Sequence, residues 1–192
     1  MSAGNLIVIS GASGVGKGTV LVGLMEICKN LEFSVSATTR PPRPTEEHGK
    51  HYYFITDEQF REMIEKDAFL EYDDHAAAFY GTPMDQLEEK LARSNVILDV
   101  EPKGAKIVKK KRPDATLIFI MPPSMEELER RLRGRGDTSD EQIAMRMERA
   151  RWEMEQSTHY DYIVTNEQVE ACADHILNII RSCADTNEFG GN

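Results

Sequence analysis

The sequence predicts an α/β fold in which a parallel sheet is flanked by helices. Leu6 to Ile9 form a short apolar run rich in β-branched residues, which is typical of a strand buried on both faces. A glycine-rich loop follows at once, and apolar residues recur at helical spacing from about Lys17. Further strand and helix patterns alternate along the chain, which favours parallel strands joined by crossover helices.

The glycine-rich loop has the spacing of a phosphate-binding loop. The run Gly11-Ala12-Ser13-Gly14-Val15-Gly16-Lys17, here called the phosphate loop, matches G-x-x-x-x-G-K between a strand and a helix, as this motif requires. Its glycines let backbone N–H groups turn towards an anion at the positive end of the helix dipole. Lys17 adds a mobile cation for the outer phosphates. The motif therefore predicts a P-loop NTPase-type sheet that binds a nucleotide.

The residue after Lys17 departs from the usual form of this loop. Gly18 stands where a Ser or Thr hydroxyl usually reaches Mg²⁺, and the first hydroxyl comes at Thr19. Adenylate kinases also carry Gly-Lys-Gly-Thr, so nucleotide binding is still expected. The protein ligand of the metal stays open, with Thr19 or Asp99 as candidates acting through water.

Composition points to one soluble domain with small-molecule partners. The 192 residues include 29% charged and 40% hydrophobic residues, as in an ordinary globular protein, and the net charge of −10 disfavours a nucleic-acid surface. The first apolar run is too short to span a bilayer, and no basic segment precedes it, so no membrane association is expected. Three cysteines without a C-x-x-C pair indicate reduced thiols in a cytoplasmic protein. A monomer or homodimer is expected.

A stiff loop with two arginines follows the first helix. Residues 33–37 read as a short strand, and three prolines hold the segment that follows it extended. Arg40 and Arg43 cannot pair with each other there, and a guanidinium fork binds phosphate oxygens in a bidentate manner. The alternative is two solvated arginines. This loop predicts a second anion site.

Short strands and a capped helix make residues 36–85 a small α+β insert. Residues 49–55 and 69–72 read as strands. Thr56-x-x-Gln59 is a capping box that begins a helix between them. Thr82 is expected to cap the next helix.

Core strands resume at residues 96–101, and arginines gather in a later segment. Asp99 and Glu101 lie at the carboxyl end of this strand, where ligands bind in open α/β sheets. An Asp there could instead cap a neighbouring helix. Residues 116–121 and 161–166 read as the remaining strands. Between them, Ser124-x-x-Glu127 and Ser139-x-x-Gln142 are expected to cap the starts of two helices. Four arginines beside two glycines end the first helix and three more follow on the second, which is typical of a basic flap.

These residues together resemble guanylate kinases over roughly residues 4–181. The motifs that carry the resemblance are the phosphate loop, Ser36-Ala-Thr-Thr-Arg40-Pro-Pro-Arg43, Phe69-Leu-Glu71, Tyr80-Gly-Thr82, Leu98-Asp99-Val-Glu101, Arg131-Leu-Arg-Gly-Arg135-Gly and Val164-Thr-Asn166. The phosphate loop alone names only a superfamily. The second and third motifs are narrower, because they concern the acceptor nucleotide.

The resemblance implies a division of the chain into three moving parts. Residues 1–184 would form a single guanylate-kinase-like domain, followed by a disordered tail at 185–192. Within this domain the core would comprise residues 1–35, 86–125 and 151–184, the GMP-binding insert residues 36–85, and a helical lid residues 126–150.

The resemblance also implies a reaction and its site residues. The γ-phosphoryl group of ATP, with Mg²⁺ as cofactor, would pass to GMP or dGMP in purine nucleotide metabolism. Lys17, Arg40, Arg131, Arg135 and Arg146 would be catalytic. GMP would be bound by Ser36, Arg40, Arg43, Tyr52, Glu71, Tyr80, Thr82, Asp99 and Glu101, and ATP by residues 11–19 and Asn166.

The hydrogen-bonding pattern of guanine supports these assignments. N1–H and N2–H₂ are adjacent donors that one carboxylate such as Glu71 can accept together, while O6 and N7 suit the hydroxyls of Ser36 and Thr82. Adenine would present a lone pair to Glu71, and a site built on buried hydrogen bonds can reject such a misfit by about 10⁴-fold.

Two other functions fit parts of the sequence. Gly-Lys-Gly-Thr also suits an adenylate kinase, and a ribosyl bisphosphate kinase has a related fold, but Ser36, Glu71 and Thr82 together weigh against both. A guanylate-kinase-like protein-binding module usually loses the phosphate loop, which is intact here. Departures from the family pattern lie beside the acceptor site, at Ala76-Ala77-Ala78 and Pro102-Lys103.

Overall fold

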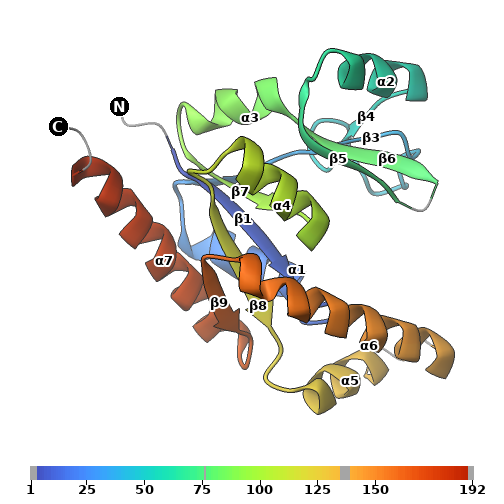
Figure 1. Ribbon diagram of the computed structural model, residues 1–192, viewed down its shortest axis with the longest axis vertical. Coiled ribbons are helices and arrows are strands. Elements are labelled where there is room, and N and C mark those ends of the chain that lie inside the picture. Colours follow the sequence, from blue (N-terminus) through green and yellow to red (C-terminus); the bar gives the residue numbers. More distant parts are fainter. Residues whose placement is uncertain (1–3, 76, 135–138, 190–192) are drawn as a thin grey trace.

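The computed structural model describes residues 4–75, 77–134 and 139–189 of the chain. A parallel sheet with the strand order β2-β7-β1-β8-β9 forms its centre (Figure 1). Its strands are β1 (Leu6–Gly11), β2 (Leu31–Phe33), β7 (Asn95–Asp99), β8 (Thr116–Met121) and β9 (Tyr162–Thr165). The predicted α/β fold with a parallel sheet is confirmed.

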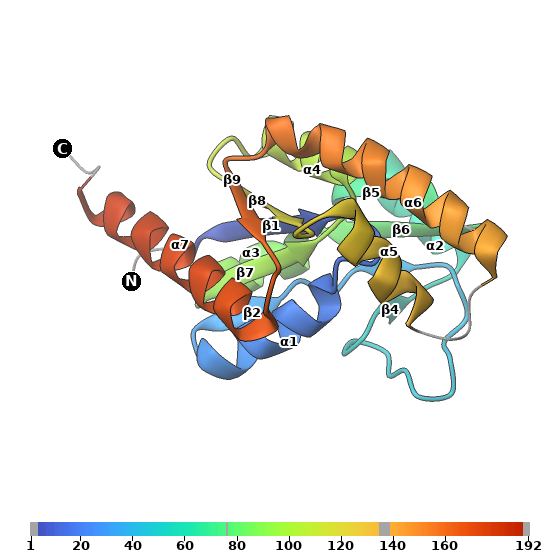
Figure 2. The ribbon, with the colours of Figure 1, turned by 90° about the horizontal axis from the view of Figure 1, so that it is seen from below.

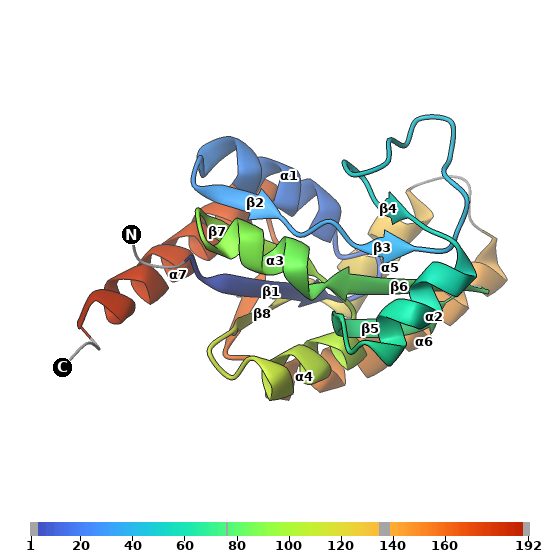
Figure 3. The same ribbon diagram turned by 90° about the horizontal axis from the view of Figure 1, so that it is seen from above.

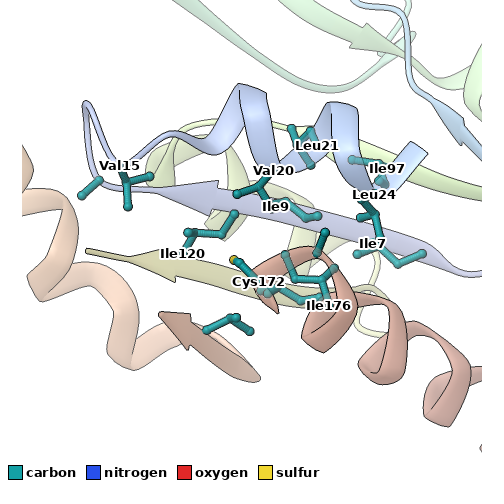
Figure 4. Close-up of a cluster of buried hydrophobic side chains, with 14 of the residues drawn as sticks. Ile7, Ile9, Val15, Val20, Leu21, Leu24, Ile97, Ile120, Cys172 and Ile176 are labelled. Carbon is teal, nitrogen blue, oxygen red and sulfur yellow. The ribbon is translucent and has the colours of Figure 1, made fainter. Parts of the chain in front are cut away.

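Helices cover both faces of this sheet, which explains the fully apolar strand β1. Ile7 and Ile9 point into a cluster with α1 (Lys17–Ile27) and α7 (Val169–Phe189), as Figure 4 shows. Leu6 and Val8 point the other way, into a cluster with α3 (Met84–Leu91) and α4 (Pro102–Lys111). Each fully buried aliphatic side chain stabilises the fold by roughly 1.5–3 kcal/mol. Figure 3 shows α1 and α4 on opposite faces of the sheet.

A second, smaller sheet lies beside the first, with the order β4-β3-β6-β5. Its strands are β3 (Ala37–Thr38), β4 (Tyr53–Phe54), β5 (Phe69–His75) and β6 (Ala78–Pro83). Helix α2 (Asp57–Glu65) buries Phe60 against Phe69 and Phe79, with ring centroids 4.4 and 5.2 Å apart. All of these elements lie within the segment predicted to be an insert (Figure 1).

In the described residues, helical segments connect β8 to β9, and Figure 2 shows the two longer ones, α5 (Met125–Arg133) and α6 (Asp140–Glu155). Helix α5 packs against α6, and the short 3₁₀ helix η1 (Gln156–His159) follows. Ser124 accepts a hydrogen bond from the backbone N–H of Glu127, and Ser139 and Gln142 form a reciprocal capping box. The predicted caps of both helices are therefore confirmed.

Three predictions of local structure were wrong. Residues 33–37 are not one strand, because β2 and β3 pair in different sheets. Only Tyr53 and Phe54 of the predicted strand at 49–55 are in a named strand. Thr82 does not cap α3: Pro83 occupies the cap position without a side-chain hydrogen bond, and the hydroxyl of Thr82 is bonded to Glu71.

The C-terminal tail also differs from the prediction. The disordered tail was expected from residue 185, whereas α7 continues to Phe189, and residues 190–192 lie outside the described part of the chain. None of the helices in the described residues is long and apolar enough to cross a membrane.

Candidate functional site: two adjoining cavities

The phosphate loop lines a cavity of about 400 Å³ at the carboxyl edge of the central sheet. Residues 11–19 form one wall, and Val100, Glu101, Pro102, Arg149 and Glu153 form the other. Gly14 and Gly16 have φ angles of +88° and +92°, a backbone conformation that L side chains rarely adopt. The loop can therefore bend around an anion, although the N–H groups of Ala12, Ser13 and Val15 already donate to protein acceptors.

Lys17 lies at the start of α1 and forms an ion pair with Asp99 at the end of β7. The two side chains are 23% and 42% exposed, so each can exchange its partner for an incoming group. Lys17, Val100 and Glu101 line the first cavity and also a second one. The two cavities therefore adjoin at these residues.

The second cavity has a volume of about 370 Å³ and lies between the two sheets. It brings together six of the residues predicted to bind GMP, namely Ser36, Tyr52, Glu71, Tyr80, Asp99 and Glu101. Asp73, Gly81 and Gly104 also line it and were not predicted from the sequence. Carboxylates, hydroxyls and a lysine around one cavity suit a ligand with several hydrogen-bond donors and an anionic part.

Glu71 is the buried carboxylate of this second cavity, with only 7% of its surface exposed. Burial raises its pKa, and a 2.6 Å hydrogen bond from the hydroxyl of Thr82 partly opposes that shift. Thr82 is fully buried and does not line the cavity, so it orients Glu71 from behind. A Cβ atom on Gly104 would lie 3.1 Å from Oε2 of Glu71, so the glycine allows the carboxylate to lie close to α4.

Arg40 is held beside the same cavity by several contacts. Its Nη atoms form two 2.9 Å hydrogen bonds with Glu46, and its Nε donates to the hydroxyl of Tyr80 at 3.3 Å. Its guanidinium also lies 5.5 Å from the ring centroid of Tyr52. The guanidinium lowers the pKa of Glu46 to about 2, with help from the backbone N–H of Arg43. The Arg43 side chain is exposed and lines neither cavity.

Of the predicted lid arginines within the described residues, only Arg131 is bonded to the phosphate loop, and neither Arg131 nor Arg146 lines either cavity. Arg131 donates to the backbone oxygens of Val15 and Asn166 at 3.2 and 3.0 Å, and it lines neither cavity. Arg146 is half-buried on α6, with no hydrogen bond or ion pair to the described residues. Arg135 lies outside the described residues.

Arg149 and Glu153 line the first cavity instead, and sequence reasoning did not assign them to the site. Glu153 is 4% exposed and accepts hydrogen bonds from the backbone N–H of Ser13 at 2.6 Å and from Nε of Arg149 at 2.9 Å. Arg149 also forms an ion pair with Glu101 through Nη2. The i, i+4 spacing on a predicted helix could have indicated the first pair, but not its place beside the phosphate loop.

Asn166 lies directly beneath the phosphate loop. Its Nδ2 donates to the backbone oxygen of Val15 at 2.8 Å, and a Cβ atom on Gly16 would lie 3.0 Å from it. The side chain is buried, and its Oδ1 has no hydrogen-bond partner among the described residues. An unpaired buried acceptor is costly unless a ligand or water supplies a donor.

No group of three or more His, Cys, Asp or Glu side chains in the described residues could enclose a metal ion. Thr19 is exposed and lines the first cavity. Apart from the chain neighbours and the backbone of α1, no heavy atom of the described residues lies within 4 Å of a Cβ atom built on Gly18. These features suit an ion such as Mg²⁺, which keeps several waters and is held largely by substrate phosphates.

Comparisons with known proteins agree with this geometry. The guanylate kinase family model matches residues 3–183. The guanylate kinase of Prochlorococcus marinus strain MIT 9312 is 44% identical over 178 residues, which cover 92% of this chain and 97% of the relative. That of Escherichia coli K12 is 42% identical over 185 residues, covering 95% and 89%.

A solved structure shows the same likeness. The crystal structure of guanylate kinase from Anaplasma phagocytophilum superposes with a TM-score of 0.72 at 36% sequence identity, covering 94% of this chain and 86% of that one. The family model and these relatives span nearly the whole chain, including both cavities. The chain therefore belongs to the guanylate kinase family.

Proposed function

We propose that this chain transfers the γ-phosphoryl group of ATP to GMP, giving ADP and GDP. The proposal depends on one observation: two cavities adjoin, one lined by the phosphate loop and the other by the buried carboxylate of Glu71. Lys17 lines both cavities, so it can contact the phosphoryl group on the donor and again on the acceptor after transfer.

The first cavity suits the donor nucleotide. Backbone N–H groups of Gly14 and residues 16–19 would bind the phosphates, and Lys17 would exchange Asp99 for the outer phosphate oxygens. Asn166 lines neither cavity, so its contact with the N6 amino group of adenine is proposed from the resemblance and requires its buried, unpaired Oδ1 to become accessible when the nucleotide binds.

The second cavity suits the acceptor nucleotide. Glu71 would accept N1–H and N2–H₂ of guanine, with Thr82 holding the carboxylate and Ser36 and Glu101 adding contacts. Arg40, Tyr52 and Tyr80 already contact one another beside the cavity, which supports a role in binding the GMP phosphate. Arg43 would join them through its exposed guanidinium.

The chemistry needs no protein nucleophile. An oxygen of the GMP phosphate attacks the γ-phosphorus, the bond to the ADP oxygen breaks, and the protein positions the groups, neutralises charge and excludes water. Mg²⁺ would supply further charge neutralisation, with Thr19 or Asp99 contacting its waters. Arg131, Arg135 and Arg146 remain proposed to stabilise the transferring group, the first by moving away from Val15.

We also propose that the chain has three moving parts within residues 1–184: the core, the GMP-binding insert at 36–85 and the lid at 126–150. Separate sheets in core and insert support this division. A bisubstrate ATP–GMP analogue should compact the protein and raise its Tm more than either nucleotide does alone. Identical scattering curves with and without it would contradict closure.

The resemblance to guanylate kinases is the basis for two further parts of the proposal. dGMP should also be an acceptor, and the reaction should serve purine nucleotide metabolism in the cytoplasm. The partners proposed are therefore nucleotides, in a protein that is a monomer or a homodimer.

A coupled assay of ADP release tests the proposal directly, with Mg·ATP as donor and GMP, dGMP, AMP, UMP or CMP as acceptor. We expect GMP to be the best acceptor, dGMP to be used, and the other nucleotides to react at least 10³-fold less efficiently, an order of magnitude set by buried hydrogen-bond discrimination. Preference for AMP would instead indicate an adenylate kinase. Absence of ADP release with every acceptor would indicate a binding module.

Lys17→Met is the matched negative control for this assay. It should leave the melting temperature nearly unchanged, because the Lys17–Asp99 pair is partly exposed, and lower turnover by orders of magnitude. Near-native turnover of this variant would overturn the role of the phosphate loop.

A further inference from the structure

Arg149 lies where the two cavities meet, although neither its type nor its spacing on α6 marks it out from the other arginines of that helix. It lines the first cavity, and its ion-pair partner Glu101 lines both. Arg146 lines neither cavity, and Arg151 is exposed without a bonded partner among the described residues. Arg149 is therefore the arginine of α6 that bridges the donor and acceptor sides.

Two carboxylates hold the guanidinium of Arg149, and they differ in exposure. The side chain of Glu153 is 5% exposed and is fixed a second time by the backbone N–H of Ser13 in the phosphate loop. The side chain of Glu101 is 50% exposed and has no other bonded partner among the described residues. Glu153 is thus the permanent support, while Glu101 is the partner that can be exchanged.

Resting on the function proposed above, we propose that Arg149 couples the two nucleotide sites by exchanging Glu101 for a phosphate of the donor. Glu153 holds the Nε side of the guanidinium against the phosphate loop, so Nη2 can exchange Glu101 for the phosphates in the first cavity while the guanidinium stays in place. Release of Glu101 returns its carboxylate to the second cavity, where it accepts donors of the acceptor nucleotide.

The exchange is favourable for physical reasons. A phosphate group carries more negative charge than a carboxylate and accepts bidentate hydrogen bonds from a guanidinium. A half-exposed ion pair such as Arg149–Glu101 contributes little free energy. Breaking it can therefore change the affinity of the second nucleotide by only about 2- to 5-fold. Donor binding should therefore strengthen acceptor binding by this factor, and the reverse must hold by linkage.

Isothermal titration calorimetry of GMP, with and without Mg²⁺ and the β,γ-imido analogue of ATP, tests this coupling. For the wild-type chain we expect the analogue to lower the Kd of GMP by about 2- to 5-fold. In Arg149→Gln the coupling should disappear. GMP alone should then bind at least as tightly as to the wild type, because Glu101 is no longer engaged, while the analogue should bind about 10-fold more weakly.

Two further variants make the test specific. Arg151→Gln removes the same charge from the same helix at an exposed position without a bonded partner, and it should keep the wild-type coupling. Arg149→Lys keeps the charge but not the fork, so coupling should be reduced rather than lost, even if the glutamine variant proves unstable. Thermal unfolding of each variant reports whether the fold is retained.

The outcomes separate this inference from the proposed function. Equal coupling in the wild type and Arg149→Gln, or absence of coupling in the wild type, would overturn the role of Arg149 while leaving the phosphotransferase intact. A wild-type chain that fails to bind GMP at all would overturn both.

Discussion

Thr82 donates a 2.6 Å hydrogen bond to Oε1 of Glu71, and both side chains are buried. Only Glu71 reaches the second cavity, so Thr82 acts on this cavity through the carboxylate that it orients. The sequence had led us to expect a helix cap and a direct contact with guanine at Thr82. Its one hydroxyl proton is instead used inside the protein.

Thr82→Val should weaken use of GMP, because it keeps the shape of the side chain but removes the donor. One oxygen of Glu71 then loses its buried partner, at a cost of about 1–3 kcal/mol. We expect kcat/KM for GMP to fall about 10-fold and KM for ATP to stay the same in steady-state assays. Thr82→Ser retains the donor and should keep most of the activity. If Thr82→Val and Thr82→Ser lowered kcat/KM for GMP equally, the cause would be altered packing and not the lost hydrogen bond.

The pH dependence of kcat/KM for GMP should reflect the titration of Glu71. Burial raises the pKa of this carboxyl group above its ordinary value of 4.5. The two guanine donors need an ionised carboxylate, so kcat/KM should increase as pH rises through the raised pKa. The free energy of unfolding changes with pH in the opposite direction. The contribution of Glu71 to it is fully present below pH 4.5 and is lost as pH rises through the folded-state pKa.

Glu71→Gln separates this titration from that of the GMP phosphate, which remains in the variant. We would measure kcat/KM and the free energy of unfolding in urea over a pH series. The contribution of Glu71 to both pH profiles should be absent in the variant only. An identical pH profile in both proteins would show that Glu71 does not titrate in this range.

Gly104→Ala should impair GMP binding without destabilising the fold. Its Cβ would lie 3.1 Å from Oε2 of Glu71 and 3.3 Å from Cβ of Val100, so the carboxylate must shift by a few tenths of an ångström. Alanine in α4 also stabilises the helix by up to about 1 kcal/mol. We expect a KM for GMP raised about 10-fold with an unchanged or higher Tm.

Gly23→Ala is the matched control for this variant. It lies within α1, where a Cβ would make ordinary contacts at 3.8 and 3.9 Å with Val169 and Ala173. It should gain similar helix stability and keep the wild-type KM. A raised KM in both variants would mean that the effect of Gly104→Ala is not local to Glu71.

Gly18→Ser should fit without strain and lower the Mg²⁺ concentration needed for half-maximal activity. Beyond the chain neighbours and the backbone of α1, none of the described residues has a heavy atom within 4 Å of the added Cβ, and a hydroxyl would stand beside the phosphate loop. Titration of activity with Mg²⁺, and the Mg²⁺ dependence of ATP-analogue binding by calorimetry, measure the change. An unchanged Mg²⁺ dependence would show that the ion lies out of reach of this position.

The sequence predicted those features that depend on residues close together in the chain. The phosphate loop was recognisable because strand, glycines, Lys17 and helix are contiguous. The caps at Ser124 and Ser139 were recognisable because both partners lie within one turn. The central strands were recognisable because burial on both faces requires continuous apolar runs.

The sequence could not reveal contacts that depend on how elements pack. Arg131, Arg146 and Arg149 are equivalent by residue type, and only the packing of α5 and α6 decides which of them faces the cavity. Glu153 and Ser13 are separated by 140 residues along the chain. The break between β2 and β3 was missed because a short strand-like segment does not show which sheet each residue joins.

Steady-state kinetics of Glu71→Gln with GMP and with AMP test the base-reading claim most directly. The amide places a donor against a guanine N–H and leaves two buried donors unpaired, at roughly 1–3 kcal/mol each. GMP efficiency should therefore fall about 10- to 1000-fold, KM for ATP should barely change, and the preference for GMP over AMP should narrow. A change in GMP efficiency of less than about twofold, as for a surface carboxylate, would contradict the account.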